Sequence, residues 1–297
     1  MRLAITIATR NRRAELERTC AALARLEPPA DEFWICADGC DDDTVEWVRR
    51  HCPEAQLMVH AQSRHSIRSR DEMLGATDCD IVVGLDDDSY PLDKDFVSVV
   101  KARFAAWPDC AVLSFPQRTD EFPGTLAQAD FGPTMLVGTY VNAASAIRRQ
   151  AYLDLGGWPL FFEHAADEPD FALRCIASGW QVIHDTSIII RHHWSALMRN
   201  EVRVHHRHAR NELWSVLLRC PCPWWPLVAL RRAAGQFGYA CRRGPSWMGR
   251  EPLWWWEAAK GFMRVWQQRQ SLEWSAYSRW RQLLRNPQPV AEKGVLT

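Results

Sequence analysis

Short apolar runs alternate with segments of helical spacing over the first 115 residues. The runs predict strands at residues 3–8, 33–37, 57–60, 81–86 and 111–115. Apolar positions recur every three or four residues between them, which predicts helices at residues 13–26, 44–50, 66–76 and 95–106. This regular alternation predicts an α/β fold, in which helices sandwich a mostly parallel sheet and the crossovers are right-handed.

The pattern is less regular between residues 116 and 200. Prolines predict a loop at 116–135, followed by an extended segment at 138–144 and a short helix at 148–155. A further helix is predicted at 171–178, opened by the acidic segment 167–170, with strands at 182–183 and 187–190.

Tryptophan and arginine interleave at helical spacing beyond residue 200. This predicts an α-helical, Trp/Arg-rich extension at 201–285, followed by a disordered tail at 286–297. We therefore divide the chain into an α/β domain at 1–200, with halves at about 1–115 and 116–200, and this extension. The extension suits a peripheral contact with a membrane surface; packing on the α/β domain or on a second subunit is the alternative.

Composition narrows the function classes. The 297 residues carry 36 basic and 36 acidic side chains, so a broad electrostatic contact with nucleic acid is not expected. No apolar stretch approaches the ~20 residues that span a bilayer, and the first residues predict a strand rather than a secretory leader. The 10 cysteines are scattered, which favours reduced thiols and a cytoplasmic location, at the inner face of the membrane if the extension docks there.

Three consecutive acids, Asp86, Asp87 and Asp88, end the central apolar run. The run from Ile81 does not alternate, which is typical of a strand buried on both faces, and Pro91 prevents its simple continuation. Ligands bind at the carboxyl ends of such strands in open α/β sheets. Asp86 and Asp88 point to the same side of an extended chain, so they are candidate ligands for Mg²⁺ or Mn²⁺; a solvated acidic turn is the alternative.

The acidic run and four other motifs resemble the GT-A glycosyltransferases of family 2, which transfer a sugar from a nucleotide donor. The matching motifs are Thr9-Arg10-Asn11 after the first strand, residues 37–44 (similar to D-D-G-S-x-D-x-T), Arg70-Asp71 (similar to A-R-N), residues 86–88 (D-x-D) and residues 167–174 (similar to E-D-x-D-L-x-x-R). The resemblance covers about residues 1–215. It departs from the family pattern at Ala37, at Cys40, at Asp71 and in the swapped order of Asp167 and Glu168.

The resemblance implies a GT-A fold, a cofactor that is Mg²⁺ or Mn²⁺, and a nucleotide-sugar donor, with UDP- or dTDP-linked sugars favoured. Its implied nucleotide-binding residues are Thr9, Arg10, Asn11, Asp38, Arg70, Asp86 and Asp87, with Asp38 contacting the nucleobase. Its implied metal ligands are Asp86 and Asp88, together with His192 or His193 after a late strand. A surface histidine pair is the alternative for those last two residues.

The start of the helix at 171–178 is implied to supply the base that takes the acceptor proton. Glu168 is the first candidate because it occupies the family's base position, and Asp167 is the second because the two acids are swapped. Asp170 supports the loop or touches the acceptor. The helix N-terminus lowers the pKa of Glu168 and burial raises it, so the sequence leaves the direction open.

Gly157, Trp158 and Arg174 are candidates for the acceptor pocket, because an aromatic face suits a sugar ring. A core position for Trp158 and pairing of Arg174 with nearby acids are the alternatives. Histidines at 205, 206 and 208 with cysteines at 220 and 222 suggest zinc, but their spacing matches none of the usual structural sites.

We therefore expect an inverting, metal-dependent glycosyltransferase with a glycan or lipid-linked acceptor. A sugar-nucleotidyltransferase is a second hypothesis, although the loop after the first strand lacks the glycines of a phosphate-binding loop. The third is a catalytically inactive subunit that binds nucleotide sugar or glycan, which Ala37, Asp71 and the swapped acids keep open.

Overall fold

The computed structural model describes residues 1–194 and 200–290. Its α/β part contains β1 (Leu3–Thr9), α1 (Arg13–Leu23), β2 (Glu32–Asp38), α2 (Thr44–His51), β3 (Gln56–His60), α3 (Ser66–Ala76), β4 (Ile81–Asp86), β5 (Ser89–Pro91), α4 (Phe96–Ala106), β6 (Cys110–Ser114), β7 (Gln117–Thr119), β8 (Met135–Leu136), β9 (Ala144–Arg148), α5 (Arg149–Asp154), α6 (Asp167–Ala177), β10 (Gln181–His184) and β11 (Ile190–His192). The helical part contains α7 (Glu201–Arg219), α8 (Trp225–Arg243), α9 (Pro245–Met248), α10 (Glu251–Gln267) and α11 (Trp274–Arg285), and β12 (Gln288–Pro289) follows.

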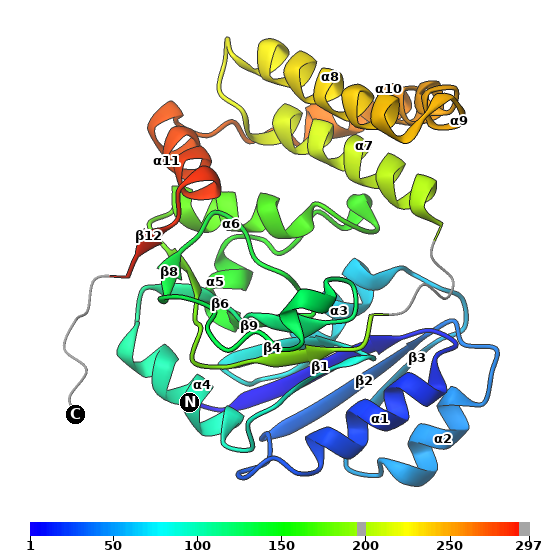
Figure 1. The fold of residues 1–297 in the computed structure, drawn as a ribbon, viewed down its shortest axis with the longest axis vertical. Helices are drawn as coiled ribbons and strands as arrows, with labels where there is room; N and C mark the ends of the chain where they lie inside the picture. The colour runs from blue at the N-terminus through cyan, green and yellow to red at the C-terminus, as the bar shows by residue number, and fades with distance from the viewer. Residues whose placement is uncertain (195–199, 291–297) are drawn as a thin grey trace.

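The described strands form a large sheet and a small one. The large sheet has the order β12-β8-β10-β6-β9-β4-β1-β2-β3, and several of its strands are labelled in Figure 1. The small sheet has the order β5-β11-β7. The strands β4, β1, β2 and β3 are parallel, so β1, β2 and β4 end at one edge. That edge carries the loop after β1, the acidic segment after β2 and the three acids after β4, as the sequence predicts.

Two apolar layers enclose the sheet, because β4 and its neighbours carry apolar side chains on both faces. Ile81, Val83 and Leu85 of β4 pack with α1, α2 and α4, while Val82 faces α3, α5 and α6. The three-layer α/β architecture predicted from the alternating pattern is therefore confirmed.

The sheet differs from the prediction in its second half. β9 runs antiparallel between β4 and β6, although the sequence pattern placed the extended segment earlier, at 138–144. Its small residues Ala144, Ser145 and Ala146 carry little strand signal, and they fit because neighbouring strands cover both faces. β11 also lies later than the predicted strand at 187–190, and it contains His192.

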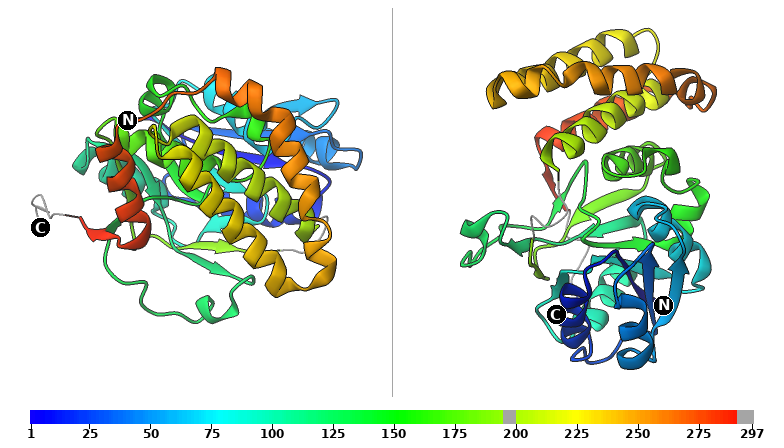
Figure 2. Two further views of the ribbon diagram at one scale, coloured as in Figure 1. Left: turned by 90° about the horizontal axis from the view of Figure 1, so that it is seen from above. Right: turned by 90° about the vertical axis from the view of Figure 1, so that its right-hand side faces the viewer.

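The helical part forms a further layer on the side of α6. Leu173 and Ile176 of α6 pack against Tyr277 and Trp280 of α11 in one buried cluster. α8 and α10 lie beyond α7, on the side away from the sheet (Figures 1 and 2). Residues 288 and 289, predicted within a disordered tail, instead pair with β8; residues 291–297 lie outside the described part of the chain.

Close contact between α7 and α10 depends on Gly261. A Cβ atom at this position would lie 2.3 Å from Cζ2 of Trp214, so any side chain would force the helices apart. Trp214 Nε1–H donates to the carbonyl of Ala258 at 3.1 Å across the same contact. Within the described residues, no helix is both long enough and apolar enough to cross a membrane.

Candidate active site

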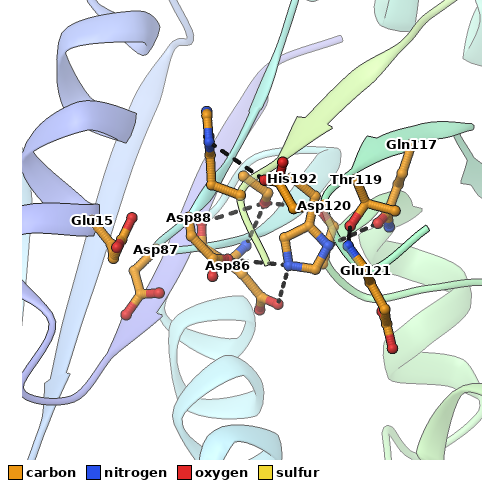
Figure 3. A network of polar contacts seen from close by, with 12 residues as sticks. Glu15, Asp86, Asp87, Asp88, Gln117, Thr119, Asp120, Glu121 and His192 are labelled. Atoms are coloured by element: carbon orange, nitrogen blue, oxygen red, sulfur yellow. Dashed lines mark hydrogen bonds and ion pairs between the residues drawn. The ribbon is translucent and has the colours of Figure 1, made fainter. Parts of the chain in front are cut away.

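The three acids after β4 point in different directions. The Asp86 N–H donates to Ser89 Oγ at 2.8 Å, and the Ser89 hydroxyl donates to the carbonyl of Ala143 at 2.9 Å, which fixes the turn. Asp86 and Asp88 face the ring of His192, whereas Asp87 lies on the other side of the turn (Figure 3). The predicted convergence of Asp86 and Asp88 is therefore observed, although a turn at residues 87 and 88, rather than an extended chain, produces it.

Asp86, Asp88 and His192 form the one group of potential ligands close enough to share a metal ion within the described chain, with ligand atoms within 4.8 Å of one another. His192 Nε2 lies 3.2 Å from Asp88 Oδ1 and 4.0 Å from Asp86 Oδ2. Its other nitrogen, Nδ1, lies 2.9 Å from Gln117 Oε1, which can only accept a hydrogen bond. Nδ1 therefore donates its hydrogen to Gln117, and the ring presents Nε2 toward the carboxylates (Figure 3).

This donor set fits a divalent cation. Two carboxylates and one imidazole are ligands that Mn²⁺ accepts, and Mg²⁺ takes the carboxylates. Burial raises the pKa of Asp88, but His192 and Arg12 together lower it by more than burial raises it. The pKa therefore lies below its ordinary value, and the carboxylate is charged. His193 lies elsewhere: its Nε2 is 2.9 Å from the hydroxyl of Tyr90.

Asp87 joins the acidic turn to the loop after β1 and to α1. Thr9 Oγ1 donates to Asp87 Oδ2 at 2.7 Å, and Arg12 Nη1 lies 3.1 Å from Asp87 Oδ1. Arg12 also donates to Asp88. Burial raises the pKa of Asp87 to about 7, with Arg12 opposing that rise. The predicted nucleotide residues Thr9 and Asp87 thus contact each other, while Arg10 is exposed.

The acidic segment after β2 is held by the loop before α3. Asp38 is 5% exposed, and its carboxylate accepts hydrogen bonds from the N–H groups of Arg64 at 2.7 Å and His65 at 3.0 Å. Ser63 Oγ and His60 Nδ1 lie 2.6 and 2.8 Å from the same carboxylate. Burial raises the pKa of Asp38, but these contacts lower it below its ordinary value. Asp38 therefore lies at the predicted edge of the large sheet, and its carboxylate already has hydrogen-bond partners within the protein.

Arg70 lies between the two acidic groups of the site. Its guanidinium donates to Asp86 Oδ1, and it is buried near Asp167 and Glu168. Burial lowers the pKa of Arg70, and the surrounding carboxylates raise it above its ordinary value. A fixed positive charge therefore links the acids after β4 to those at the start of α6.

Asp167 and Glu168 occupy the first turn of α6, as predicted. Asn142 Nδ2 donates to Asp167 Oδ2 at 2.7 Å, and Asp167 is 2% exposed. Ala165 and Ala166 before the helix have φ of 70° and 63°, a left-handed conformation that non-glycine residues rarely adopt. Strained backbone of this kind is enriched at functional sites.

The surroundings of Glu168 change its pKa clearly. Burial raises its pKa well above the ordinary value, the neighbouring Asp167 raises it further, and Arg70 partly opposes both. The direction that the sequence left open is thus upward. A carboxyl group with a raised pKa is suited to proton transfer near neutral pH.

A cavity of about 500 Å³ opens over the first turn of α6. Its lining comprises Ser66, Arg70, Thr139, Tyr140, Asn142, residues 164–169, His208, Glu212, Ser215, Val216, Arg232, Tyr277, Trp280 and Leu284. The α/β part contributes the two acids, and α7, α8 and α11 contribute the opposite wall. The helical part therefore completes the site.

The family model of glycosyl transferase family 2 matches residues 4–156, just over half of the chain. The chain belongs to glycosyl transferase family 2. It is a glycosyltransferase, as the resemblance of the five motifs indicated. A search of curated proteins finds no match.

Solved structures of other glycosyltransferases share its GT-A fold. The mannosyltransferase PcManGT from Pyrobaculum calidifontis, in complex with GDP-Man and Mn²⁺, is 18% identical, with 88% of this chain and 87% of that chain covered and a TM-score of 0.59. S. aureus TarS 1-349 in complex with UDP-GlcNAc is 15% identical, with coverage of 73% and 67% and a TM-score of 0.58. GalNAc-T7 with UDP, GalNAc and Mn²⁺ is 10% identical, with coverage of 73% and 48% and a TM-score of 0.60.

Asp170 in this family-2 chain does not line the cavity. It is completely buried, and Arg174 Nε and Arg219 Nε each donate to its carboxylate at 3.1 Å. Burial raises the pKa of Asp170, but Arg219 and Arg174 lower it below the ordinary value. Its role is therefore the supporting one of the two that the sequence allowed, because it holds α7 on α6 rather than touching an acceptor.

The residues assigned to the acceptor pocket are also packed inside the protein. Arg174 donates to the carbonyls of Leu155 and Gly157 at 2.7 and 2.6 Å. Trp158 is 6% exposed, and its Nε1–H donates to the hydroxyl of Tyr140 at 2.9 Å. The structure thus supports the alternative interpretation of both residues: Trp158 belongs to the core, and Arg174 pairs with the acid Asp170. Through its bond to Tyr140, which lines the cavity, Trp158 supports the cavity wall from behind.

Sequence reasoning missed Arg12, Asn142 and His164. Arg12 is one position beyond the loop motif that the resemblance identified, so a longer match to that motif would have included it. Asn142 reaches the site because the segment before β9 lies against Gly84 of β4, and His164 because its Nδ1 lies 3.3 Å from Ser66 Oγ of α3. Neither residue carries a local sequence signal. The family departure at Asp71 has a packing reason, since the hydroxyl of Tyr152 donates to its carboxylate at 2.7 Å.

Proposed function

We propose that this glycosyltransferase is an inverting, metal-dependent enzyme that uses a UDP- or dTDP-sugar and transfers the sugar to a hydroxyl group of a glycan or lipid-linked acceptor. The observation that carries the proposal is the connection of two acidic centres through Arg70. One centre combines Asp86, Asp88 and His192. The other, Asp167 and Glu168, lines the cavity shared with the helical part.

Asp86, Asp88 and His192 would hold Mg²⁺ or Mn²⁺. A bound cation of this kind neutralises charge on a departing diphosphate. Arg12 keeps Asp88 ionised and Gln117 fixes the His192 tautomer, so both prepare the ligands before donor binding. PcManGT and GalNAc-T7 were crystallised with Mn²⁺, which supports a divalent ion.

Glu168 would accept the proton of the acceptor hydroxyl. Its raised pKa makes it a stronger base once ionised, and Arg70 stabilises the ionised form. One base on the acceptor side and one diphosphate site on the other suit a single displacement, which inverts the anomeric centre. NMR of the product's anomeric coupling tests this stereochemistry.

The nucleotide preference rests on the edge formed by β1, β2 and β4. Asp38 is the candidate for nucleobase contact, together with Thr9, Arg10 and Asn11. TarS and GalNAc-T7 bind uridine nucleotides and PcManGT binds GDP-Man, so uracil has the broader support. Thermal shifts with UDP, dTDP, GDP and CMP, each with and without Mn²⁺, test the choice.

We also propose that the enzyme works in the cytoplasm, at the inner face of the cytoplasmic membrane. The outer helices α8 and α10 expose large apolar side chains, among them Leu230 (69%) and Trp256 (62%). Tryptophan and aliphatic side chains on an interfacial helix are suited to the boundary between lipid headgroups and acyl chains.

The decisive test of the whole proposal is release of nucleoside diphosphate from a nucleotide sugar, with acceptor and Mn²⁺ present. Release in wild type and its loss in Asp88→Asn support the enzyme. Binding of the nucleotide without any release would favour the inactive subunit instead.

A further inference from the structure

A second hollow of about 710 Å³ lies beside the active-site cavity, between α8 and α11. We call it the arginine groove, after its four arginines: Arg231 and Arg232 of α8, and Arg281 and Arg285 of α11. The groove and the cavity share the wall residues Glu212, Arg232, Tyr277 and Leu284. The groove therefore adjoins the space in front of Glu168.

Positive charge in the arginine groove is largely uncompensated. Glu212 is the one carboxylate among its lining residues, and it lies 3.7 Å from Arg232. Arg231, Arg281 and Arg285 form no ion pair with any residue that the structure describes. The chain as a whole has a net charge of zero, so this excess is local. Clustered like charges repel, and a bound anion removes that repulsion.

The same groove exposes apolar surface. Trp224 and Trp274 contact each other with ring centroids 5.7 Å apart, yet they are 47% and 40% exposed, and Leu227 beside them is 62% exposed. The other large apolar or aromatic lining residues are Val228, Tyr239, Tyr277 and Leu284. An apolar surface next to four arginines matches a ligand that is anionic at one end and hydrocarbon at the other.

We propose that the arginine groove binds an acceptor whose phosphate group is attached to an apolar chain. This inference rests on the proposed function and names its acceptor class. Arginine presents a planar set of donors that suits phosphate, and the Trp224–Leu227–Trp274 surface suits the chain. The shared wall of groove and cavity then places the rest of the acceptor toward Glu168. A neutral glycan would leave both the charge and the apolar surface unused.

The first experiment measures binding directly, without donor or turnover. Intrinsic tryptophan fluorescence of the full chain is titrated with farnesyl phosphate, inorganic phosphate and farnesol, each below its aggregation limit. We expect farnesyl phosphate to bind at least about tenfold more tightly than either of the others, because only it uses both halves of the groove.

Two variant sets locate the site. The double variant Arg231→Gln/Arg285→Gln should weaken farnesyl phosphate at least about tenfold. Matched controls are Arg242→Gln on α8 and Arg279→Gln on α11, which are exposed on the same helices but do not line the groove. The controls should bind as wild type does.

Equal binding by the groove variant and the controls would overturn the proposal. The proposal would also be overturned if inorganic phosphate bound as tightly as farnesyl phosphate. That result would mean that the groove binds anions but makes no use of the apolar chain. The UDP–Mn²⁺ thermal shift is recorded for every variant. Its retention shows that the fold and donor site are intact, so failure of the groove is distinguished from failure of the proposed enzyme.

Discussion

Arg70 donates a hydrogen bond to Asp86 and also lowers the pKa of Glu168, so one guanidinium acts on both ends of the site. Because the side chain is only 11% exposed, water screens its charge weakly. The candidate metal ligand Asp86 and the proposed base Glu168 are thereby linked through a single residue.

Replacement of Arg70 should change the pH dependence of turnover. In Arg70→Gln the pKa of Glu168 loses the positive charge that helps to lower it and rises further, so more alkaline conditions are needed to ionise the base. The acid limb of the rate profile should therefore move to higher pH. Initial rates of nucleoside diphosphate release across the pH range measure this. Arg68→Gln, on the exposed side of α3, is the control and should leave the limb in place; an unchanged limb in Arg70→Gln would contradict the coupling.

Loss of Asp88 should abolish metal-dependent nucleotide binding. Wild-type protein with UDP at about 100 times its Kd and saturating Mn²⁺ should gain about 2.7 kcal/mol of stability. Asp88→Asn removes one ligand charge and should lose most of that gain; because it also weakens the buried pair with Arg12, its shift is measured against its own melting temperature without ligand. Asp93→Asn, an exposed acid after β5, is the control. A full metal-dependent shift in Asp88→Asn would refute the metal assignment.

The first half of the fold could be predicted because its central strands β1 and β4 are buried on both faces and short apolar runs alternate with segments of helical spacing, so pattern and structure agree. β4 illustrates this: an unalternating run predicted a central strand, and the same run placed Asp86 at the ligand-binding edge. β9 could not be predicted, because its small side chains fit only in the presence of β4 and β6 on either side.

The site was predictable where residues adjoin a strand or helix end. Asp86, Asp88 and Glu168 belong to that class. The convergence of His192 on the acids depends instead on β11 pairing with β5, and the buried position of Asp170 depends on Arg219 of α7. Both are tertiary contacts between segments far apart in the chain, which no local pattern encodes.

Glu168→Gln should lose activity and gain stability at neutral pH. Removal of a general base lowers turnover by about 10²–10⁴-fold. The pKa of Glu168 is higher in the folded than in the unfolded chain, so its contribution to stability is lost as pH rises through the folded pKa. Glutamine cannot ionise, so the melting temperature of the variant should exceed that of wild type by a growing margin as pH rises from the unfolded pKa toward the folded one. Asp167→Asn is the comparison: turnover that falls there but not in Glu168→Gln would reverse the base assignment.

Asp170→Ala should destabilise the protein strongly, because Arg174 and Arg219 would be left without their shared buried partner. Breaking a buried ion pair costs about 3–5 kcal/mol, which urea denaturation measures. The pKa of Asp170 is lowered by folding, so its stabilising contribution is present above the unfolded pKa and is lost as pH falls through the folded one. The double variant Asp170→Ala/Arg219→Ala should be less destabilised than the sum of the single variants. Additive values would mean that the two side chains do not stabilise each other.

Membrane association should depend on the outer face of α10. Leu253, Trp256 and Met263 are 60%, 62% and 61% exposed, and their spacing of three and seven residues places them on one side of the helix. Leu253→Ser/Trp256→Ser removes much of that apolar area and should reduce co-sedimentation with anionic lipid vesicles, because interfacial binding scales with buried apolar surface.

The control is Val59→Ser on β3, a residue that is 46% exposed in the α/β part, and this variant should bind vesicles as wild type does. Turnover of a water-soluble acceptor should be unchanged in both variants, since none of these residues lines the cavity. Equal sedimentation of both variants with wild type would exclude α10 as the membrane-binding surface.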